Sequence, residues 1–213
     1  MDITSAKAAA ALLAKHWKEG TTLAALPLSL RPVSRAEGYA IQAQIEAQSR
    51  EPLFGWKIAA TSLAGQKHIG VDGPIAGRLL AERVYCDGDT LPFGANRMRV
   101  AEAEFAFRMC RDLPPRQAPY ALSEVLDAVA ELHLAIEIPD SRYMDFVTVG
   151  APQLIADNAC AHCFVLGPKA PGVWRQLDLA LHSVVGRVGD RLARNGLGAN
   201  VLGDPRIALT WRS

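Results

Sequence analysis

The sequence predicts an α+β fold in which an N-terminal helical segment precedes a mixed, β-rich core. The first 50 residues show apolar side chains at helical spacing and a capping pattern, whereas short apolar runs bounded by turn residues follow from residue 53 onward. The 213 residues, 50% hydrophobic and 21% charged, suit one globular domain that can bury a core. We divide the chain into a helical segment at 1–52 and a β-rich domain at 53–213.

The N-terminal helical segment rests on two patterns. Residues 4–19 place alanine, leucine and tryptophan side chains near helical spacing, which predicts an amphipathic helix. Ser34 and Glu37 form the S-x-x-E pattern of a capping box, which predicts a second helix that runs to about Gln48. Two prolines between these helices predict a connecting loop.

A buried strand is predicted at residues 54–60, where one lysine, Lys57, lies within an apolar run. Burying an ammonium group is costly unless it is paired or faces a cavity. The pattern alone leaves two interpretations open. Lys57 either extends to solvent at a sheet edge or lines a cavity inside the protein.

Most of the remaining chain is predicted to consist of short strands, turns and two helices. We expect a helix at 63–69, a turn-rich loop at 71–77, a hairpin-type turn at 86–90, a strand at 100–107, a helix at 123–132, a strand within 134–142, and strands at 165–167 and 179–185. Two of these strands, at 100–107 and within 134–142, carry acidic side chains.

Three carboxylates are expected to converge from these two strands. Alternation along a strand puts Glu102 and Glu104 on the same face, and a neighbouring strand that carries Glu137 would bring the third carboxylate beside them. Like charges so close raise each other's pKa, and a divalent cation relieves the repulsion. An all-oxygen ligand set suits Mg²⁺, Mn²⁺ or Ca²⁺ rather than Zn²⁺. The alternative is that Glu102 and Glu104 line the solvated face of an ordinary strand.

Four short motifs occur in order along the chain: GWKIAATS at 55–62, EAE at 102–104, EIPDSR at 137–142 and ADNA at 156–159. This series resembles the 2-keto-4-pentenoate hydratase branch of the fumarylacetoacetate hydrolase superfamily. The resemblance implies a fumarylacetoacetate-hydrolase-like catalytic domain at 53–213 after the helical segment at 1–52. It also implies that a divalent cation, Mg²⁺ or Mn²⁺, is bound by Glu102, Glu104 and Glu137.

The same resemblance assigns roles to further residues. Lys57 would be catalytic, close to the cation and to the oxygens of the substrate. The residues that would contact the substrate are Thr61, Ser62, Ile75 and Cys160. Asp140 and Arg142 would order the strand that carries Glu137 without being metal ligands themselves. Relatives often carry an acidic residue near Ile75 and a serine at the position of Cys160, which leaves the exact substrate open.

The activity that the resemblance implies is the hydration of a 2-hydroxy-2,4-dienoate, or 2-keto-4-pentenoate, to a 4-hydroxy-2-oxo acid, as in aromatic catabolism. Two enzyme alternatives share the metal site: decarboxylation of a 2-oxo-3-enedioate (4-oxalocrotonate), and hydrolysis of an acylpyruvate. A non-enzymatic alternative is a truncated homologue that binds a metal or a partner without turnover. Members of the branch continue past Trp211 through a helix and further strands, so we expect a core that is incomplete at its C-terminus.

Composition bounds the partners and the compartment. A net charge of +1 gives no electrostatic case for binding nucleic acid or an anionic membrane, and no apolar run is long enough to span a membrane. We expect a cytoplasmic enzyme whose partner is a small 2-oxo or 2-hydroxy-dienoic acid, and the resemblance implies a homo-oligomer. The four cysteines are expected to be reduced packing residues, because Cys160 and Cys163 lack the second ligand pair of a structural zinc site.

Overall fold

The structure is a computed structural model that describes residues 1–211. Residues 212 and 213, the last two of the predicted β-rich domain, lie outside the described residues. The α-helices are α1 (Ile3–Glu19), α2 (Arg35–Ala43), α3 (Leu63–Ile69), α4 (Leu122–Asp127), α5 (Ala151–Ala156) and α6 (Pro205–Ala208). The strands are β1 (Leu53–Ala59), β2 (Ile75–Leu80), β3 (Val84–Cys86), β4 (Glu102–Met109), β5 (Val129–Ile138), β6 (Cys163–Lys169), β7 (Ser183–Val188) and β8 (Leu192–Leu197).

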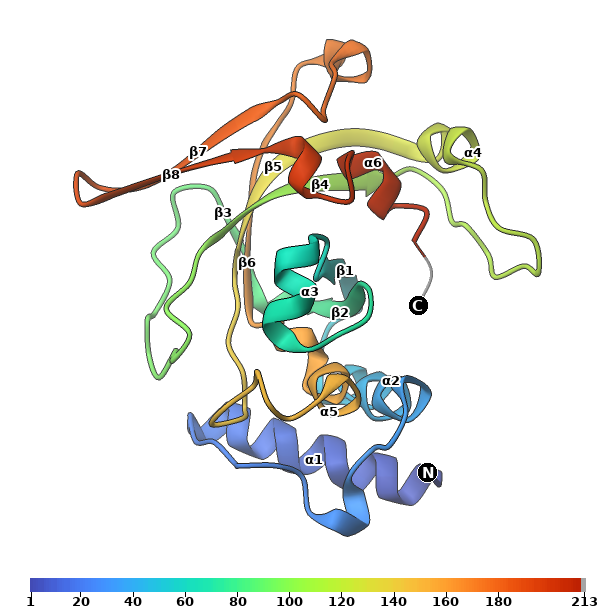
Figure 1. The fold of residues 1–213 in the computed structure, drawn as a ribbon, viewed down its shortest axis with the longest axis vertical. Helices are drawn as coiled ribbons and strands as arrows, with labels where there is room; N and C mark the ends of the chain where they lie inside the picture. The colour runs from blue at the N-terminus through green and yellow to red at the C-terminus, as the bar shows by residue number, and fades with distance from the viewer. Residues whose placement is uncertain (212–213) are drawn as a thin grey trace.

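Helices α1, α2 and α5 pack together at one end of the molecule, and the larger sheet lies at the other (Figure 1). The predicted helix at 4–19 is confirmed: Asp2 caps it by accepting a hydrogen bond from the Ser5 N–H at 2.9 Å. Alanines on the buried face of α1 let Ile41 and Tyr143 pack closely against it. The second helix is shorter than predicted, because α2 ends at Ala43 and a separate 3₁₀ turn follows. Within residues 1–211, no helix has the length and apolar character needed to cross a membrane.

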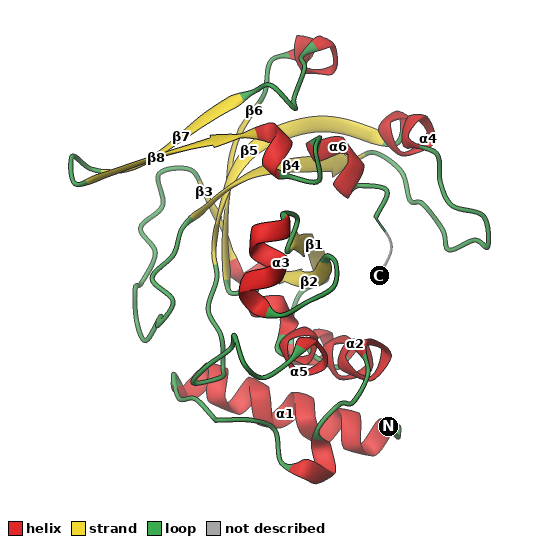
Figure 2. Cartoon of the chain, in the orientation of Figure 1, coloured by secondary structure: helices red, strands yellow, loops and turns green. Residues whose placement is uncertain are grey.

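The strands form three separate sheets (Figure 2). A four-stranded sheet has the order β3-β6-β5-β4, in which β4 and β6 both run antiparallel to β5 and β3 runs parallel to β6. Strands β1 and β2 form a two-stranded antiparallel sheet, and β7 and β8 form another. The predicted strands at 54–60, 100–107 and 165–167 are therefore confirmed, with boundaries shifted by a few residues.

The predicted loop at 71–77 is wrong in its second half. Strand β2 begins at Ile75, which lies opposite Ala59 of β1. The Ile75 side chain is fully buried and packs against Leu154 and Ile155 of α5. Gly and Pro just before it suggested a longer turn, but burial of a branched apolar side chain favours the strand.

The predicted helix at 123–132 is too long. Helix α4 ends at Asp127, and β5 begins at Val129. Val129 and Leu132 are buried against Trp174, which stabilises the extended strand over continued helix.

Two further predictions need correction on the sheet side of the molecule. The turn at 86–90 is present, since Asp89 N–H donates to the Cys86 carbonyl at 3.1 Å, but it makes no hairpin because β3 pairs in parallel with β6. The strand predicted at 179–185 begins only at Ser183, because the buried Leu179 lies in the preceding turn.

Candidate metal centre

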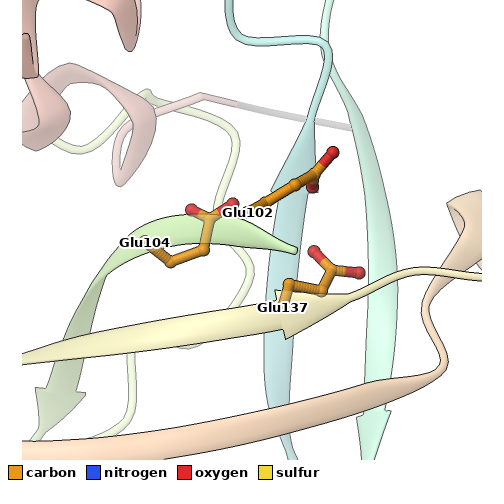
Figure 3. Close-up of side chains that lie close together, drawn as sticks. All are labelled: Glu102, Glu104 and Glu137. Atoms are coloured by element: carbon orange, nitrogen blue, oxygen red, sulfur yellow. The ribbon is translucent and has the colours of Figure 1, made fainter. Parts of the chain in front are cut away.

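Strands β4 and β5 bring three carboxylates onto one face of the four-stranded sheet. Glu102 lies directly opposite Glu137 in the antiparallel register, and Glu104 follows two residues later on the same face of β4. One carboxylate oxygen of each side chain lies within 4.8 Å of those of the other two. Figure 3 shows the three carboxyl groups turned to the same side of the two strands.

A lysine from the two-stranded β1–β2 sheet completes the cluster. Lys57 Nζ lies 3.1 Å from Glu137 Oε1, and the two side chains are only 9% and 2% exposed. This ion pair is the contact of the buried Glu137 Oε1, to which no other described residue donates a hydrogen bond. Of the two interpretations that the sequence left open, Lys57 therefore follows the second and faces the interior.

The cluster perturbs the pKa of each of its buried members. Burial, together with the negative charges of Glu137 and Glu102, raises the pKa of Glu104 from 4.5 to about 8. Burial also raises the pKa of Glu137, against the opposing charge of Lys57. Burial alone would lower the pKa of Lys57, but the carboxylates of Glu137 and Glu102 outweigh it and raise that pKa. At neutral pH the metal-free cluster therefore holds a charged Lys57 and a proton on Glu104.

These residues fit a hard divalent cation. The converging donors of the cluster are carboxylate oxygens alone, the set preferred by Mg²⁺, Mn²⁺ and Ca²⁺. One of them, Glu137 Oε1, is a buried oxygen without a hydrogen-bond donor in the described part of the chain. A bound cation would take the place of the Glu104 proton and add a second positive charge beside that oxygen.

We expect the affinity for Mg²⁺ to rise with pH by up to about tenfold per unit until about pH 8, and then to level off. The reason is that the pKa of Glu104 is raised to about 8, so the cation must displace a proton at lower pH. Titration calorimetry in two buffers of different ionisation enthalpy would measure both the affinity and the protons released. Affinity that does not change between about pH 6 and pH 8 would exclude Glu104 as a ligand.

Thr61 and Ser62 lie in the turn that leads from β1 to α3. Ser62 Oγ accepts a hydrogen bond from the Gly65 N–H at 3.0 Å and so caps α3. The Thr61 carbonyl accepts one from the Leu202 N–H at 2.9 Å. These contacts fix the turn directly after the strand that carries Lys57, and the contact of Thr61 and Ser62 with substrate stays a prediction.

Ile75 and Cys160 lie in one buried cluster rather than on an open surface. The side chain of Ile75 is 0% exposed, and the contact of Ile75 and Cys160 with substrate stays a prediction. Cys160 is 6% exposed, and burial raises its pKa to about 12, so it stays a neutral thiol. The cysteines are free, but Cys86 and Cys110 are exposed, so the prediction of a packing role is wrong for those two.

Asp140 and Arg142 follow β5 and bind different partners. Asp140 Oδ1 accepts hydrogen bonds from the N–H groups of Arg97 and Met98, at 2.9 and 3.2 Å, and so holds the loop that leads into β4. Arg142 forms a buried ion pair with Asp157. A role for both residues in ordering the ligand strands stays a prediction.

Two residues without a predicted role, Gly77 and Asn158, lie close to Lys57. Gly77 is the cross-strand partner of Lys57. Asn158 hydrogen-bonds the backbone of the next residue on β2, Arg78. The ADNA motif was the available signal for Asn158, because asparagine tolerates the left-handed conformation that it adopts here, with a φ of 57°.

Comparison with known proteins gives the family. No protein-family model matches the chain. The 2-keto-4-pentenoate hydratase of Burkholderia vietnamiensis (strain G4 / LMG 22486) is 36% identical over 215 residues, which cover 99% of this chain and 80% of that protein. This chain belongs to the 2-keto-4-pentenoate hydratase family. The 2-keto-4-pentenoate hydratase 1 of Dechloromonas aromatica (strain RCB) is 34% identical over 214 residues, covering 98% of this chain and 79% of that protein.

A solved structure shows that this hydratase-family chain shares the fold of a second kind of enzyme. The 4-oxalocrotonate decarboxylase from Pseudomonas putida G7, complexed with magnesium and adipate, matches with a TM-score of 0.83 at 23% identity, over 98% of this chain and 80% of that chain. The same decarboxylase complexed with calcium and acetate matches with a TM-score of 0.81. At this identity the likeness shows the fold, and the predicted mixed α and β architecture is confirmed.

Proposed function

We propose that this chain is a divalent-metal-dependent hydro-lyase that adds water to 2-hydroxypenta-2,4-dienoate or a close relative, giving a 4-hydroxy-2-oxo acid. The observation that carries the proposal is the cluster of Glu102, Glu104 and Glu137 beside Lys57, in a chain 36% identical to a 2-keto-4-pentenoate hydratase. We propose Mg²⁺ or Mn²⁺ as the cation. Hydration converts the dienol and one water into the product. Carbons C5 and C3 each gain a proton, C4 gains the hydroxyl, and the enol oxygen at C2 loses its proton as it becomes a ketone.

The three carboxylates would hold the cation, and Lys57 would act beside it. A bound divalent cation supplies a Lewis acid for the carboxylate and the C2 oxygen of the substrate, a contribution worth several kcal/mol. In the metal-free chain the carboxylates of Glu137 and Glu102 raise the pKa of Lys57, and we propose that its ammonium group serves as a counter-charge or proton donor. Its low exposure excludes bulk water from that side of the site.

We expect the chain to consume 2-hydroxypenta-2,4-dienoate in the presence of Mg²⁺ or Mn²⁺, and to lose this activity when a chelator removes the metal. The decrease in ultraviolet absorbance of the dienoate measures turnover, and restored activity on adding metal back excludes irreversible damage. 4-Oxalocrotonate serves as the second substrate, because its decarboxylation needs the same enolate stabilisation but no added water. Metal-dependent turnover of 4-oxalocrotonate alone would make the chain a decarboxylase. Turnover of neither compound would contradict the proposal.

A further inference from the structure

The proposed site joins two sheets that share no strand pairing. The three carboxylates come from β4 and β5 of the four-stranded sheet, whereas Lys57 comes from β1 of the separate β1–β2 sheet. Hydrogen bonding within either sheet therefore does not fix the distance between Lys57 and Glu137. Something else must hold the two sheets in register at this point.

The turn at η4 (Asn158–Cys160) is hydrogen-bonded to both sheets. Asn158 Oδ1 accepts a hydrogen bond from the Arg78 N–H at 2.6 Å, and Asn158 Nδ2 donates one to the Arg78 carbonyl at 2.9 Å. The Asn158 amide thus pairs with the backbone of β2 as a neighbouring strand would. On the other side, the Cys160 carbonyl accepts from the Asp140 N–H, two residues after the end of β5, at 2.9 Å. The turn is thus a bridge between the strand pair of Lys57 and the strand of Glu137.

The conformation of this turn is costly and is held by its surroundings. Asn158, Ala159 and Cys160 have φ values of 57°, 49° and 63°. This is the left-handed region, which residues other than glycine rarely adopt. Asn158 is 0% exposed, so its amide has no access to water as an alternative partner. Backbone strain of this kind persists only where other contacts compensate for it. Here the compensating contacts are the hydrogen bonds to Arg78 of β2 and to Asp140, just after β5.

Gly77 lets the turn approach Lys57. Gly77 lies opposite Lys57 on β2, and a Cβ there would come within 2.5 Å of the Asn158 carbonyl oxygen and 3.2 Å of Lys57 Cε. The missing side chain therefore leaves room both for the turn and for the lysine chain on its way to Glu137.

We propose that Asn158 is a positioning residue that sets the Lys57 ammonium against the carboxylates of the metal centre, with Gly77 as the gap that allows it. The proposal rests on the proposed function only in taking the three carboxylates as the cation site. The Asn158 side chain hydrogen-bonds the backbone of Arg78, so it acts through β2 and Lys57.

A double-mutant cycle on Mg²⁺ affinity tests this without any assay of turnover. Calorimetry at mildly alkaline pH compares the wild-type chain with Lys57→Met, each with and without Asn158→Ala. In the wild-type background, Lys57→Met is expected to tighten Mg²⁺ binding on the order of tenfold, because an ammonium group next to Glu137 competes with the cation. In the Asn158→Ala background, the same change is expected to alter the affinity less than about threefold, because Lys57 no longer faces the carboxylates.

Gly77→Ala disturbs the same contact from β2, so it is expected to reduce the effect of Lys57→Met on Mg²⁺ affinity in the same way. It replaces Asn158→Ala if that variant does not fold. Gln153→Ala is the matched control, since the buried Gln153 amide also makes two backbone hydrogen bonds, to Leu26 N–H at 2.9 Å and to the Val149 carbonyl at 2.7 Å, away from the site. It should cost stability yet keep the tenfold effect of Lys57→Met.

Two outcomes would overturn the inference, and only the second would also overturn the proposed cation site. Undiminished coupling in both Asn158→Ala and Gly77→Ala would reduce Asn158 to a structural residue and leave the proposed function intact. Failure of the wild-type chain to bind Mg²⁺ would overturn the cation site, and this inference with it.

Discussion

Replacing Glu104 with glutamine is expected to abolish metal-dependent turnover, with a loss on the order of 10³-fold in kcat/KM. The amide keeps the size of the side chain but offers a neutral oxygen where the cation requires a charged one. The dienoate absorbance assay with saturating Mg²⁺ measures the loss. Glu131→Gln is the matched control, because Glu131 lies on β5 outside the three-carboxylate cluster and pairs with Lys169 at 2.6 Å. A Glu104→Gln variant that retains more than about a tenth of the activity would contradict its role as a ligand.

The same substitution is expected to stabilise the metal-free protein at alkaline pH. The pKa of Glu104 is about 8 in the folded chain and close to 4.5 in the unfolded one, so the folded state binds the extra proton between these values. Stability of the wild type should therefore fall as pH rises from about 4.5 to about 8 and stay low above that window. Glu104→Gln has no proton to lose there, and its urea midpoint should exceed that of the wild type at pH 8 with a chelator present. Added Mg²⁺ should then raise the midpoint of the wild type only.

The convergence of the three carboxylates could be predicted because it follows from local geometry. Glu102 and Glu104 face the same side whenever their segment is a strand, and the structure pairs that strand with β5 so that Glu102 meets Glu137. The interior position of Lys57 was left open by the sequence, since a lone lysine in an apolar run fits an edge strand equally well. It is decided by the ion pair with Glu137, a residue 80 positions along the chain.

The bridge between the two sheets could not be predicted from local pattern. Three consecutive residues of the turn adopt left-handed φ values although none of them is glycine, and asparagine at 158 is the one residue type among them that tolerates this conformation. The contacts that hold them are long-range, with 80 positions separating Asn158 from Arg78. The loop predicted at 71–77 was wrong at Ile75 for the complementary reason. The neighbouring glycine and proline indicated a loop, whereas burial of Ile75 against α5 favours a strand.

Replacing Arg142 with alanine is expected to destabilise the protein by about 3–5 kcal/mol, the largest stability effect that we expect from a single substitution here. Arg142 and Asp157 are 3% and 0% exposed, so their ion pair is almost fully buried. Asp157 also accepts hydrogen bonds from Ser141 Oγ at 2.7 Å and from the Arg142 N–H at 3.0 Å. Both survive the substitution, but the carboxylate loses its counter-charge. Urea unfolding at pH 7 measures the difference.

The pH dependence of this loss identifies its cause. Burial raises the pKa of Asp157 and the charge of Arg142 opposes that rise, so the pKa should climb further in Arg142→Ala. The stability that Arg142→Ala loses relative to the wild type should then be small at low pH, where Asp157 is protonated in both the folded and the unfolded chain. The loss should grow as pH rises. Arg116→Ala is the control: its ion pair with Glu124 spans 2.7 Å but the side chains are 37% and 45% exposed, so its loss of stability should be far smaller than that of Arg142→Ala. Equal losses for the two variants, or a deficit that does not change with pH, would mean that Arg142 acts by packing against Trp17 rather than by neutralising Asp157.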